Sequence, residues 1–451
     1  MTRPLPLWGK LAYGAGAGGW CLVDRILITW LLYFYVVSPG AEGKVLVSAF
    51  AFGLVMFLGR AIDAVADPIV ARLSDNYPGR FGRRIPFMLA SGAVYVVVFI
   101  LLFHPPFAKG STLNVLYLAV MLGLYFFLFT AYVTPYLALL PELARSTRDR
   151  VDLTTWKAVF SILGVAAAFV GGGILIGSVG LHGMLWIAGL VGVLLLYVPA
   201  FIKEKEFAAG VPATMGLRDA LQNTFKNKPF VIYLAGNVAF WLGFNIVTLN
   251  IPGYVKVLLG RDEADTAVFF GLVLGVAFLL FPAINVLSKR LGLKTMMMLS
   301  LVSFACTLPL IFFLGQPLFG LSADVCAYLI MASFGIPVST IFIVPDAIVA
   351  SLADLEEKRS GQRREAMYFG AQGFVLKLAL GISTLITGAL LQAFGSTQAS
   401  PLGVQLTGPV AAVFMLLGIL VFRGYPEDLV TKGASSTTDE SDVQSTDRAA
   451  S

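Results

Sequence analysis

The sequence predicts an all-α integral membrane protein with twelve transmembrane helices in two pseudo-symmetric six-helix bundles. Of its 451 residues, 58% are hydrophobic and only 13% are charged, and the mean hydropathy is +0.83, above the range of soluble globular proteins. About twelve apolar runs reach the roughly 20 residues that a helix needs to cross a bilayer. The longest polar interruption, from Lys203 to Lys228, divides these runs six and six.

Breaks of Pro, Gly and charge set the limits of the runs. The predicted spans are 11–38, 45–72, 86–106, 112–140, 154–178, 183–202, 230–257, 265–287, 295–315, 321–350, 367–393 and 403–423. We therefore expect a first bundle over 1–202, a cytoplasmic linker over 203–229, a second bundle over 230–425 and a disordered cytoplasmic tail over 426–451, which is rich in Ser, Thr and Asp.

The two halves carry similar turns. The segment "ARLSDNYPGRFGRR" follows the second span, and "NVLSKRLGLK" follows the eighth, and both place Leu-Ser before a basic turn that contains Gly. Paired repeats of this kind build transporters whose halves rock around a site at the midplane. A basic loop that only satisfies the positive-inside rule is the alternative interpretation.

Most of the 32 Lys and Arg residues fall in segments on the same side as the amino terminus. The positive-inside rule then predicts a multi-pass protein of the plasma (inner) membrane with both termini in the cytoplasm. This asymmetry explains the net charge of +6 and gives no reason to propose nucleic acid as a partner. The expected partners are a small-molecule solute and membrane lipid, and the fold works as a monomer.

No set of residues indicates an enzyme. The three cysteines have no metal-ligand or redox spacing, and the two histidines lie far apart in the sequence. No pattern pairs a nucleophile with a general base. We expect no cofactor, and the first apolar run is too long for a cleaved signal peptide. A non-transporting receptor would need an added soluble domain, and only the linker and the tail are extra.

An ionisable residue in an apolar span costs about 2.5–3.5 kcal/mol and is a candidate functional group. Asp63 and Asp67 are one helical turn apart, and Arg60 lies one turn earlier on nearly the same face. Two adjacent carboxylates can share a proton or bind a hard cation such as Na⁺. Lys377 lies deep in the eleventh span, so we expect it to face these carboxylates. The alternatives are that Arg60 only neutralises one Asp, and that Lys377 extends to water past Tyr368.

Other polar residues interrupt several spans and favour a polar cavity. They occur in the first, fourth, fifth and seventh spans, although single Asn or Thr residues often only join neighbouring helices. The expected substrate-binding residues are Asp24, Tyr132, Trp156, Lys157, Asn245 and Thr248.

Four segments together resemble the glycoside-pentoside-hexuronide:cation symporters, the melibiose-permease-like branch of the major facilitator superfamily. They are "KLAYGAGAGG" at Lys10, "DAVADP…GRFGRRIPF" from Asp63, "TPYLALLPELARSTRDR" from Thr134, and "VPDAIVASLADLEEKRSGQRREAMYFGAQGFVLK" ending at Lys377. Their order and spacing match to about residue 423. The resemblance implies the major facilitator fold, alternating access, and solute uptake driven by sodium, lithium or protons.

The resemblance also implies roles for particular residues. Asp63 and Asp67 would form the cation site, as metal ligands if the coupling ion is Na⁺, with Thr130 and Lys377 beside them. A cytoplasmic gate that holds the outward-open state would include Arg83, Arg84, Arg363 and Arg364.

The chain departs from the melibiose-type pattern at three places. Cys21 and Val133 stand where that type has the two carboxylates that bind the galactosyl group, which argues against a galactoside, although Asp24 lies one turn from Cys21. The family's helix-5 arginine falls at or beside Lys157. Ala66 stands where the sodium-using type has Asn, and losing this neutral oxygen favours proton over sodium coupling.

The leading hypothesis is therefore symport of a sugar or glycoside with H⁺ or Na⁺ by alternating access. Transport of a lysolipid or another amphipathic solute on the same fold is the alternative.

Overall fold

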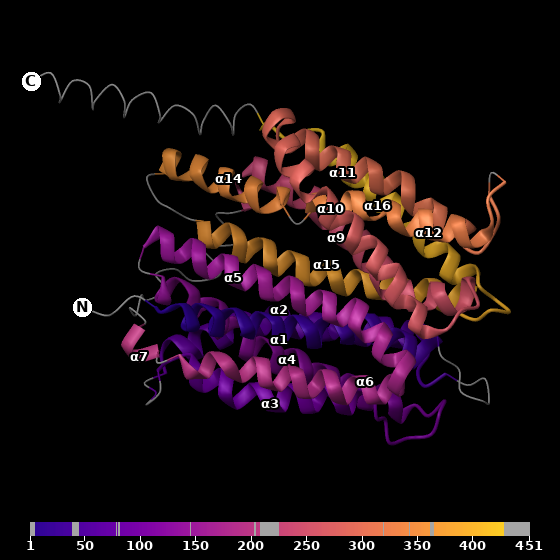
Figure 1. The fold of residues 1–451 in the computed structure, drawn as a ribbon, viewed down its shortest axis with the longest axis horizontal. Helices are drawn as coiled ribbons and strands as arrows, with labels where there is room; N and C mark the ends of the chain where they lie inside the picture. The colour runs from indigo at the N-terminus through magenta and orange to yellow at the C-terminus, as the bar shows by residue number, and fades with distance from the viewer. Residues whose placement is uncertain are drawn as a thin grey trace, which may run out of the picture.

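The computed structural model describes residues 5–37, 45–77, 79, 82–144, 146–202, 204–207, 225–318, 320–341, 343–360 and 365–427. Within these residues the chain is helical, and no β-strand forms (Figure 1). Eleven stretches of the described chain are long and apolar enough to cross a membrane. The longest, Asp149–Phe201, has 53 residues, more than twice what one crossing needs. Gly180 breaks it with a φ of 74°, so this stretch holds two of the twelve predicted crossings.

The first half comprises α1 (Leu7–Leu32), η1 (Tyr33–Val37), α2 (Ala49–Asp75), α3 (Ile85–Leu102), α4 (Leu113–Leu143), α5 (Thr147–Ala166), η2 (Ala167–Gly171), α6 (Gly172–Tyr197) and η3 (Val198–Phe201). The short helix α7 (Glu204–Phe207) follows. The second half comprises α9 (Lys228–Gly253), η4 (Tyr254–Leu258), η5 (Glu263–Asp265), α10 (Thr266–Leu291), α11 (Leu293–Thr307), η6 (Leu308–Phe313), α12 (Ala323–Ser333), α13 (Gly335–Ile341), α14 (Val344–Ser360), α15 (Glu365–Phe394) and α16 (Leu402–Phe422).

The predicted tenth span, 321–350, differs from the observed helices because it contains two prolines. A proline clashes with the carbonyl four residues earlier and interrupts the helix there. Pro337 lies four residues after Ser333, where α12 ends, and Pro345 lies four residues after Ile341, where α13 ends. The single predicted helix therefore forms three successive pieces.

Helix α2 shows the polarity expected of a membrane protein. Its exposed face carries large apolar residues three or four positions apart, while Arg60 and Asp63 are buried on the opposite side. The exposed residues are Leu54, Leu58, Ile62, Val65, Ile69 and Leu73. Water would not favour such a stripe, but lipid tails are as apolar as leucine. The arrangement places ionisable groups inside the protein and apolar groups towards lipid.

The two halves meet most extensively where α2 packs against α15, and Figure 1 shows α15 beside the first half. A Cβ on Gly53 would approach the Thr384 carbonyl to 2.6 Å, and one on Gly388 would clash with the Ala49 carbonyl. These two glycines let the backbones come close. The resulting contact holds Asp63 and Asp67 on α2 opposite Lys377 on α15.

A second contact between the halves lies at one end of the molecule. Phe169 of η2 stacks on Phe270 of α10 with ring centroids 4.1 Å apart. Nearby, the Tyr33 hydroxyl donates a hydrogen bond to the Glu263 carboxylate, which joins η1 to η5. The halves are therefore in direct contact beyond the ends of α1 and α5.

Candidate functional site

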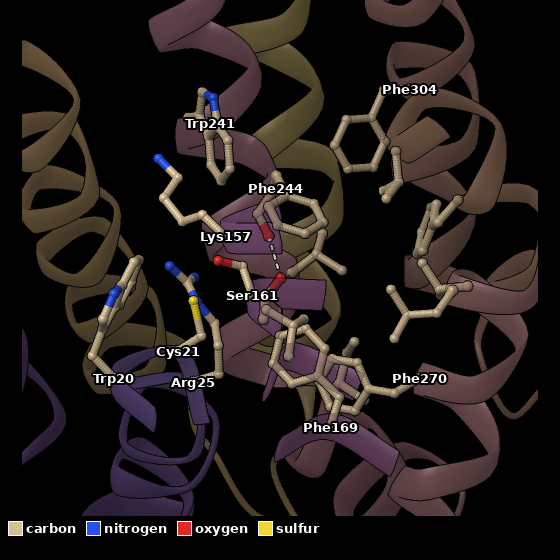
Figure 2. Close-up of a pocket in the computed structure, with 18 residues that line it drawn as sticks. Trp20, Cys21, Arg25, Lys157, Ser161, Phe169, Trp241, Phe244, Phe270 and Phe304 are labelled. Carbon is tan, nitrogen blue, oxygen red and sulfur yellow. Dashed lines mark hydrogen bonds between the residues drawn. The ribbon is translucent and has the colours of Figure 1, made fainter. Parts of the chain in front are cut away.

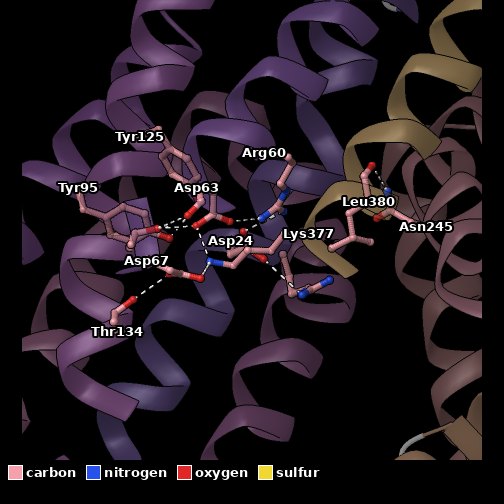
Figure 3. A network of polar contacts seen from close by, with 12 residues as sticks. Asp24, Arg60, Asp63, Asp67, Tyr95, Tyr125, Thr134, Asn245, Lys377 and Leu380 are labelled. Atoms are coloured by element: carbon pink, nitrogen blue, oxygen red, sulfur yellow. Dashed lines mark hydrogen bonds and ion pairs between the residues drawn. The ribbon is translucent and has the colours of Figure 1, made fainter. Parts of the chain in front are cut away.

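Asp63, Asp67 and Lys377 form an ion-paired group between the two halves (Figure 3). The Lys377 Nζ lies 2.8 Å from the Asp63 Oδ1 and 2.7 Å from the Asp67 Oδ2. The Asp63 side chain is fully buried, whereas that of Asp67 is 35% exposed. Each carboxylate also accepts a hydrogen bond from a threonine of α4, Thr130 to Asp63 and Thr134 to Asp67. The Lys377 ammonium of the second half thus neutralises negative charge on the aspartates of the first half.

Arg60 lies next to this group and connects it to α1. Its guanidinium is 3.3 Å from the Asp63 carboxylate and 3.5 Å from that of Asp24, and it stacks over the Phe126 ring at 4.4 Å. Asp24 is also 3.3 Å from the Arg25 guanidinium. The sequence alternative that Arg60 neutralises an Asp therefore describes part of the arrangement, and Arg60 shares its charge between two acids.

We expect Arg60→Met to destabilise the fold by about 3–5 kcal/mol, because removing one partner of a buried ion pair leaves uncompensated charge. Thermal unfolding of the purified protein in detergent measures this. The double variant Asp24→Asn/Arg60→Met restores the charge balance and should recover part of the loss. Arg290→Met, at the exposed end of α10, is the control and should change little. A stable Arg60→Met single variant would contradict the electrostatic role.

The oxygen atoms around Lys377 suit a small cation. Carboxylates and hydroxyls are hard ligands of the kind that alkali and alkaline-earth cations prefer. Asp63, Asp67, Thr130 and Thr134 supply such oxygens, and the Lys377 ammonium lies among them. No group of three or more His, Cys, Asp or Glu suited to a metal occurs among the described residues. Oxygen atoms of this kind are chemically suited to a proton or a monovalent cation.

A cavity of about 250 Å³ lies between the halves (Figure 2). The first half lines it with polar and charged groups that include Arg25, Lys157 and Ser161. The second half lines it with Thr248 and with apolar side chains. The remaining lining residues are Trp20, Cys21, Val165, Phe169, Trp241, Phe244, Val247, Ile251, Phe270, Val273, Leu274, Phe304, Phe334 and Val338. Both cations of the lining thus come from the first half, whereas its aromatic side chains come from both halves.

Of the six residues expected to bind substrate, Lys157 and Thr248 line this cavity. Asp24 lies behind Arg25 in the ion-paired group. The structure differs from the prediction at Tyr132, whose buried hydroxyl donates to the Leu196 carbonyl.

Two more of the expected residues do not line the cavity. Asn245 donates to the Ser383 hydroxyl and joins α9 to α15. The Trp156 backbone lies close to Gly14 on α1. In this conformation the Tyr132 and Asn245 side chains therefore bond neighbouring helices, and the Trp156 backbone packs against α1.

Sequence reasoning left Arg25 and Thr134 out of the candidate site. The rule that flags ionisable residues in a span applies equally to Arg25, and the helical spacing of four from Thr130 places Thr134 on the same face of α4. Trp20, Ser161 and the phenylalanines carried no signal, because such residues are ordinary in membrane helices.

The two arginines of the predicted gate that the structure describes lie within the first half. Arg83 and Arg84 both pair with Glu142 of α4, at 3.0 and 2.8 Å. The Glu204 carboxylate of α7 accepts the backbone N–H groups of both and of Ile85, so it caps the amino-terminal end of α3. In this conformation these residues join the start of α3 to α4 and to α7.

Arg363 and Arg364, the other two gate residues, lie outside the described residues. A gate formed by all four arginines therefore stays a prediction.

A family model described as "MFS/sugar transport protein" matches residues 12–425. The chain is 24% identical to the putative glycoside/cation symporter YagG of Escherichia coli (strain K12), over 94% of this chain and 91% of that protein. It is 23% identical to sodium-dependent lysophosphatidylcholine symporter 1 of Gallus gallus, over 94% of this chain and 87% of that protein.

Among solved structures, a bacterial homologue of the human lysosomal transporter Spinster, in an inward-facing and unoccupied conformation, has a similar fold. The TM-score is 0.70 at 13% identity, and the match covers 96% of this chain and 99% of that one. The likeness supports the predicted fold class, two pseudo-symmetric six-helix bundles.

Proposed function

Because this chain belongs to the MFS/sugar transport protein family, we propose that it is a secondary transporter that moves a sugar or glycoside together with H⁺ or Na⁺ by alternating access. The observation that carries the proposal is the Lys377 ammonium of the second half, bound between Asp63 and Asp67 of the first. The protein is a multi-pass membrane protein, and we place both termini in the cytoplasm on the positive-inside rule.

The charges suggest how a cation drives the change of conformation. Three carboxylates, Asp24, Asp63 and Asp67, face three cations, Arg25, Arg60 and Lys377. A proton or Na⁺ at the aspartate pair adds one positive charge, so the hold of the pair on Lys377 weakens. The contact between α2 and α15 then loosens, and the halves can change their arrangement. A cation can shift this equilibrium only by its different affinity for the two arrangements.

The same ion pairs connect the cation site to the cavity. Arg25 lines the cavity and pairs with Asp24, Asp24 pairs with Arg60, and Arg60 pairs with Asp63. A solute that attracts Arg25 weakens the ion pair between Arg25 and Asp24. Asp24 then interacts more strongly with Arg60. Arg60 then neutralises Asp63 less, so cation binding at Asp63 is favoured. Coupling of this kind is reciprocal: the cation also raises the affinity for the solute.

A second candidate is cation-coupled transport of a lysolipid or another amphipath. The aromatic and apolar lining of the second half favours it, since residues such as Phe244, Phe270 and Phe304 offer little to the hydroxyl groups of a free sugar. A relative of this chain carries the name lysophosphatidylcholine symporter. The two candidates share the fold, the cation site and the alternating-access cycle.

The test uses purified protein in liposomes with imposed pH or sodium gradients, and records charge movement while glycosides and then lysolipids are added. We expect a solute-induced current that depends on one cation and is lost in Asp67→Asn. The solute that produces the current identifies the cargo class. Solute flux that runs at the same rate without any cation gradient, and is unchanged in Asp67→Asn, would contradict cation coupling.

A further inference from the structure

The charged groups that line the cavity are all cations. Arg25 and Lys157 are the acidic or basic residues in its lining, and both come from the first half. Figure 2 shows their nitrogen atoms on one side of the cavity, with Phe270 and Phe304 on the other. A neutral sugar needs no such pair. Two positive charges that face a largely apolar space indicate a ligand that brings negative charge with it.

In the part of the chain that the structure describes, neither cation has a carboxylate of its own in direct contact. Arg25 pairs with Asp24 at 3.3 Å, but Asp24 also serves Arg60 at 3.5 Å, so one carboxylate is shared by two guanidinium groups. Lys157 has no ion-pair partner within 4.0 Å in the described part of the chain. Asp346 of α14 is near enough to interact electrostatically with Lys157, yet it does not line the cavity. A charge in such surroundings is costly until it has an anion beside it.

The rest of the cavity fits an apolar group. Trp20 and Trp241 lie on either side of the cations in Figure 2, and Phe169, Phe244 and Phe270 lie beyond them. Aromatic rings bury large apolar areas and accept a flat or flexible apolar body. The volume of about 250 Å³ is too small for a whole lipid. It fits an aryl glycoside, or a lipid headgroup together with part of its apolar chain.

We propose that the transported solute is an anionic amphipath, whose carboxylate or phosphate group binds between Arg25 and Lys157 while its apolar body packs against the aromatic residues of the second half. This inference rests on the proposed function, because it names the solute class of the same cavity. Arg can hold such an anion with two parallel hydrogen bonds, and Lys adds a point charge. The negative charge also draws Arg25 from Asp24, which is the first step of the coupling described above.

The experiment uses two pairs of probes that differ mainly in charge. The sugar pair is 4-nitrophenyl β-D-glucuronide and 4-nitrophenyl β-D-glucoside. The lipid pair is lysophosphatidic acid and the monoacylglycerol with the same chain. Binding to the full-length protein in detergent, without any gradient, is followed by quenching of tryptophan fluorescence, since Trp20 and Trp241 line the cavity. The pair that shows the effect tells whether the anion is carried on a sugar or on a lipid.

We expect the anionic member of one pair to bind at least about tenfold more tightly than its neutral partner, which corresponds to about 1.4 kcal/mol. Lys157→Met should reduce this preference to about threefold or less, and Lys157→Arg should retain it. Arg25→Met should act like Lys157→Met. If Arg25→Met fails to fold because Asp24 loses one of its two partners, the Lys157 variants decide the question. The control is Lys289→Met at the exposed end of α10. It removes one positive charge, as Lys157→Met does, but lies outside the cavity.

Equal binding of the charged and neutral partners in both pairs would overturn the inference, and so would an anion preference that survives in Lys157→Met. These outcomes are separate from those that test the proposed function. Cation-driven accumulation of a neutral glycoside without anion preference would sustain the function and sink the inference. If an anionic probe binds tightly but no cation gradient drives its accumulation, the inference would stand and the proposed function would fail.

Discussion

Asp63→Asn abolishes accumulation of solute driven by a cation gradient, and solute equilibrates to the same concentration on both sides of the membrane. Asp63 is the carboxylate that Lys377, Arg60 and Thr130 all contact, and it is completely buried. The amide keeps the shape but removes the charge that a proton or Na⁺ would neutralise. Charge-assisted contacts are worth about 1.5–3 kcal/mol, so cation binding should weaken by roughly tenfold to a hundredfold.

The measurement is uptake of labelled solute into liposomes with and without the cation gradient. Asp262→Asn is the matched control, because Asp262 is an exposed acid in the connection between η4 and η5. Exchange of solute across the membrane at equal cation concentration should survive in Asp63→Asn, which separates lost coupling from lost folding. Accumulation at the wild-type level in Asp63→Asn would exclude the aspartate pair as the coupling site.

The membrane fold could be predicted from apolar runs because the requirement of the bilayer is simple. Each crossing needs about 20 apolar residues, and this rule gave the number of crossings and most of their limits. Two details of the fold could be placed only from the backbone of the structure. The turn at Gly180 lies inside an apolar stretch without a polar loop, and hydropathy alone places such a turn only approximately. Pro337 and Pro345 divide the tenth crossing, although the breaks follow from proline chemistry once a helix is assumed.

The candidate cation site was predictable to the extent that charged residues are rare in membrane spans. Asp63, Asp67 and Lys377 were selected because each is costly in a span, and the structure brings the three together. Polar but uncharged residues gave no such discrimination. Tyr132 and Asn245 can bond a neighbouring helix as readily as a solute, and they do so here.

Thr134 changes the argument about the coupling ion. The alanine at position 66 lacks the neutral oxygen that a sodium site would use, and on that basis the sequence favours protons. The Thr134 hydroxyl lies 2.9 Å from the Asp67 Oδ1, and the Thr130 hydroxyl contacts Asp63. Two neutral oxygens from α4 therefore stand beside the pair. Oxygen ligands of this kind suit Na⁺ as well as a shared proton.

Lys377→Met is expected to increase cation affinity and to prevent transport at the same time. In the wild-type protein a cation must displace the ammonium that lies 2.7–2.8 Å from both carboxylates. Without that ammonium, Asp63 keeps Arg60 as a partner but Asp67 loses the cation that it contacts, so a net negative charge remains and attracts a cation. Apparent affinity for the coupling cation should rise at least about tenfold, since losing one competing charge contact is worth about 1.4 kcal/mol or more.

The readout is the melting temperature of the purified variant as Na⁺, Li⁺ or pH is varied, because a ligand that binds only the folded state stabilises it by RT ln(1 + L/Kd), where L is the free ligand concentration. The coupling cation should stabilise Lys377→Met at concentrations about tenfold lower than it stabilises the wild type. Solute accumulation should be lost, since a cation that stays bound in both arrangements no longer favours one of them. Lys289→Met removes an exposed ammonium elsewhere and should leave both properties unchanged. If Lys377→Met binds cations as the wild type does, the ammonium does not compete for the site. The contact between α2 and α15 would then need another trigger.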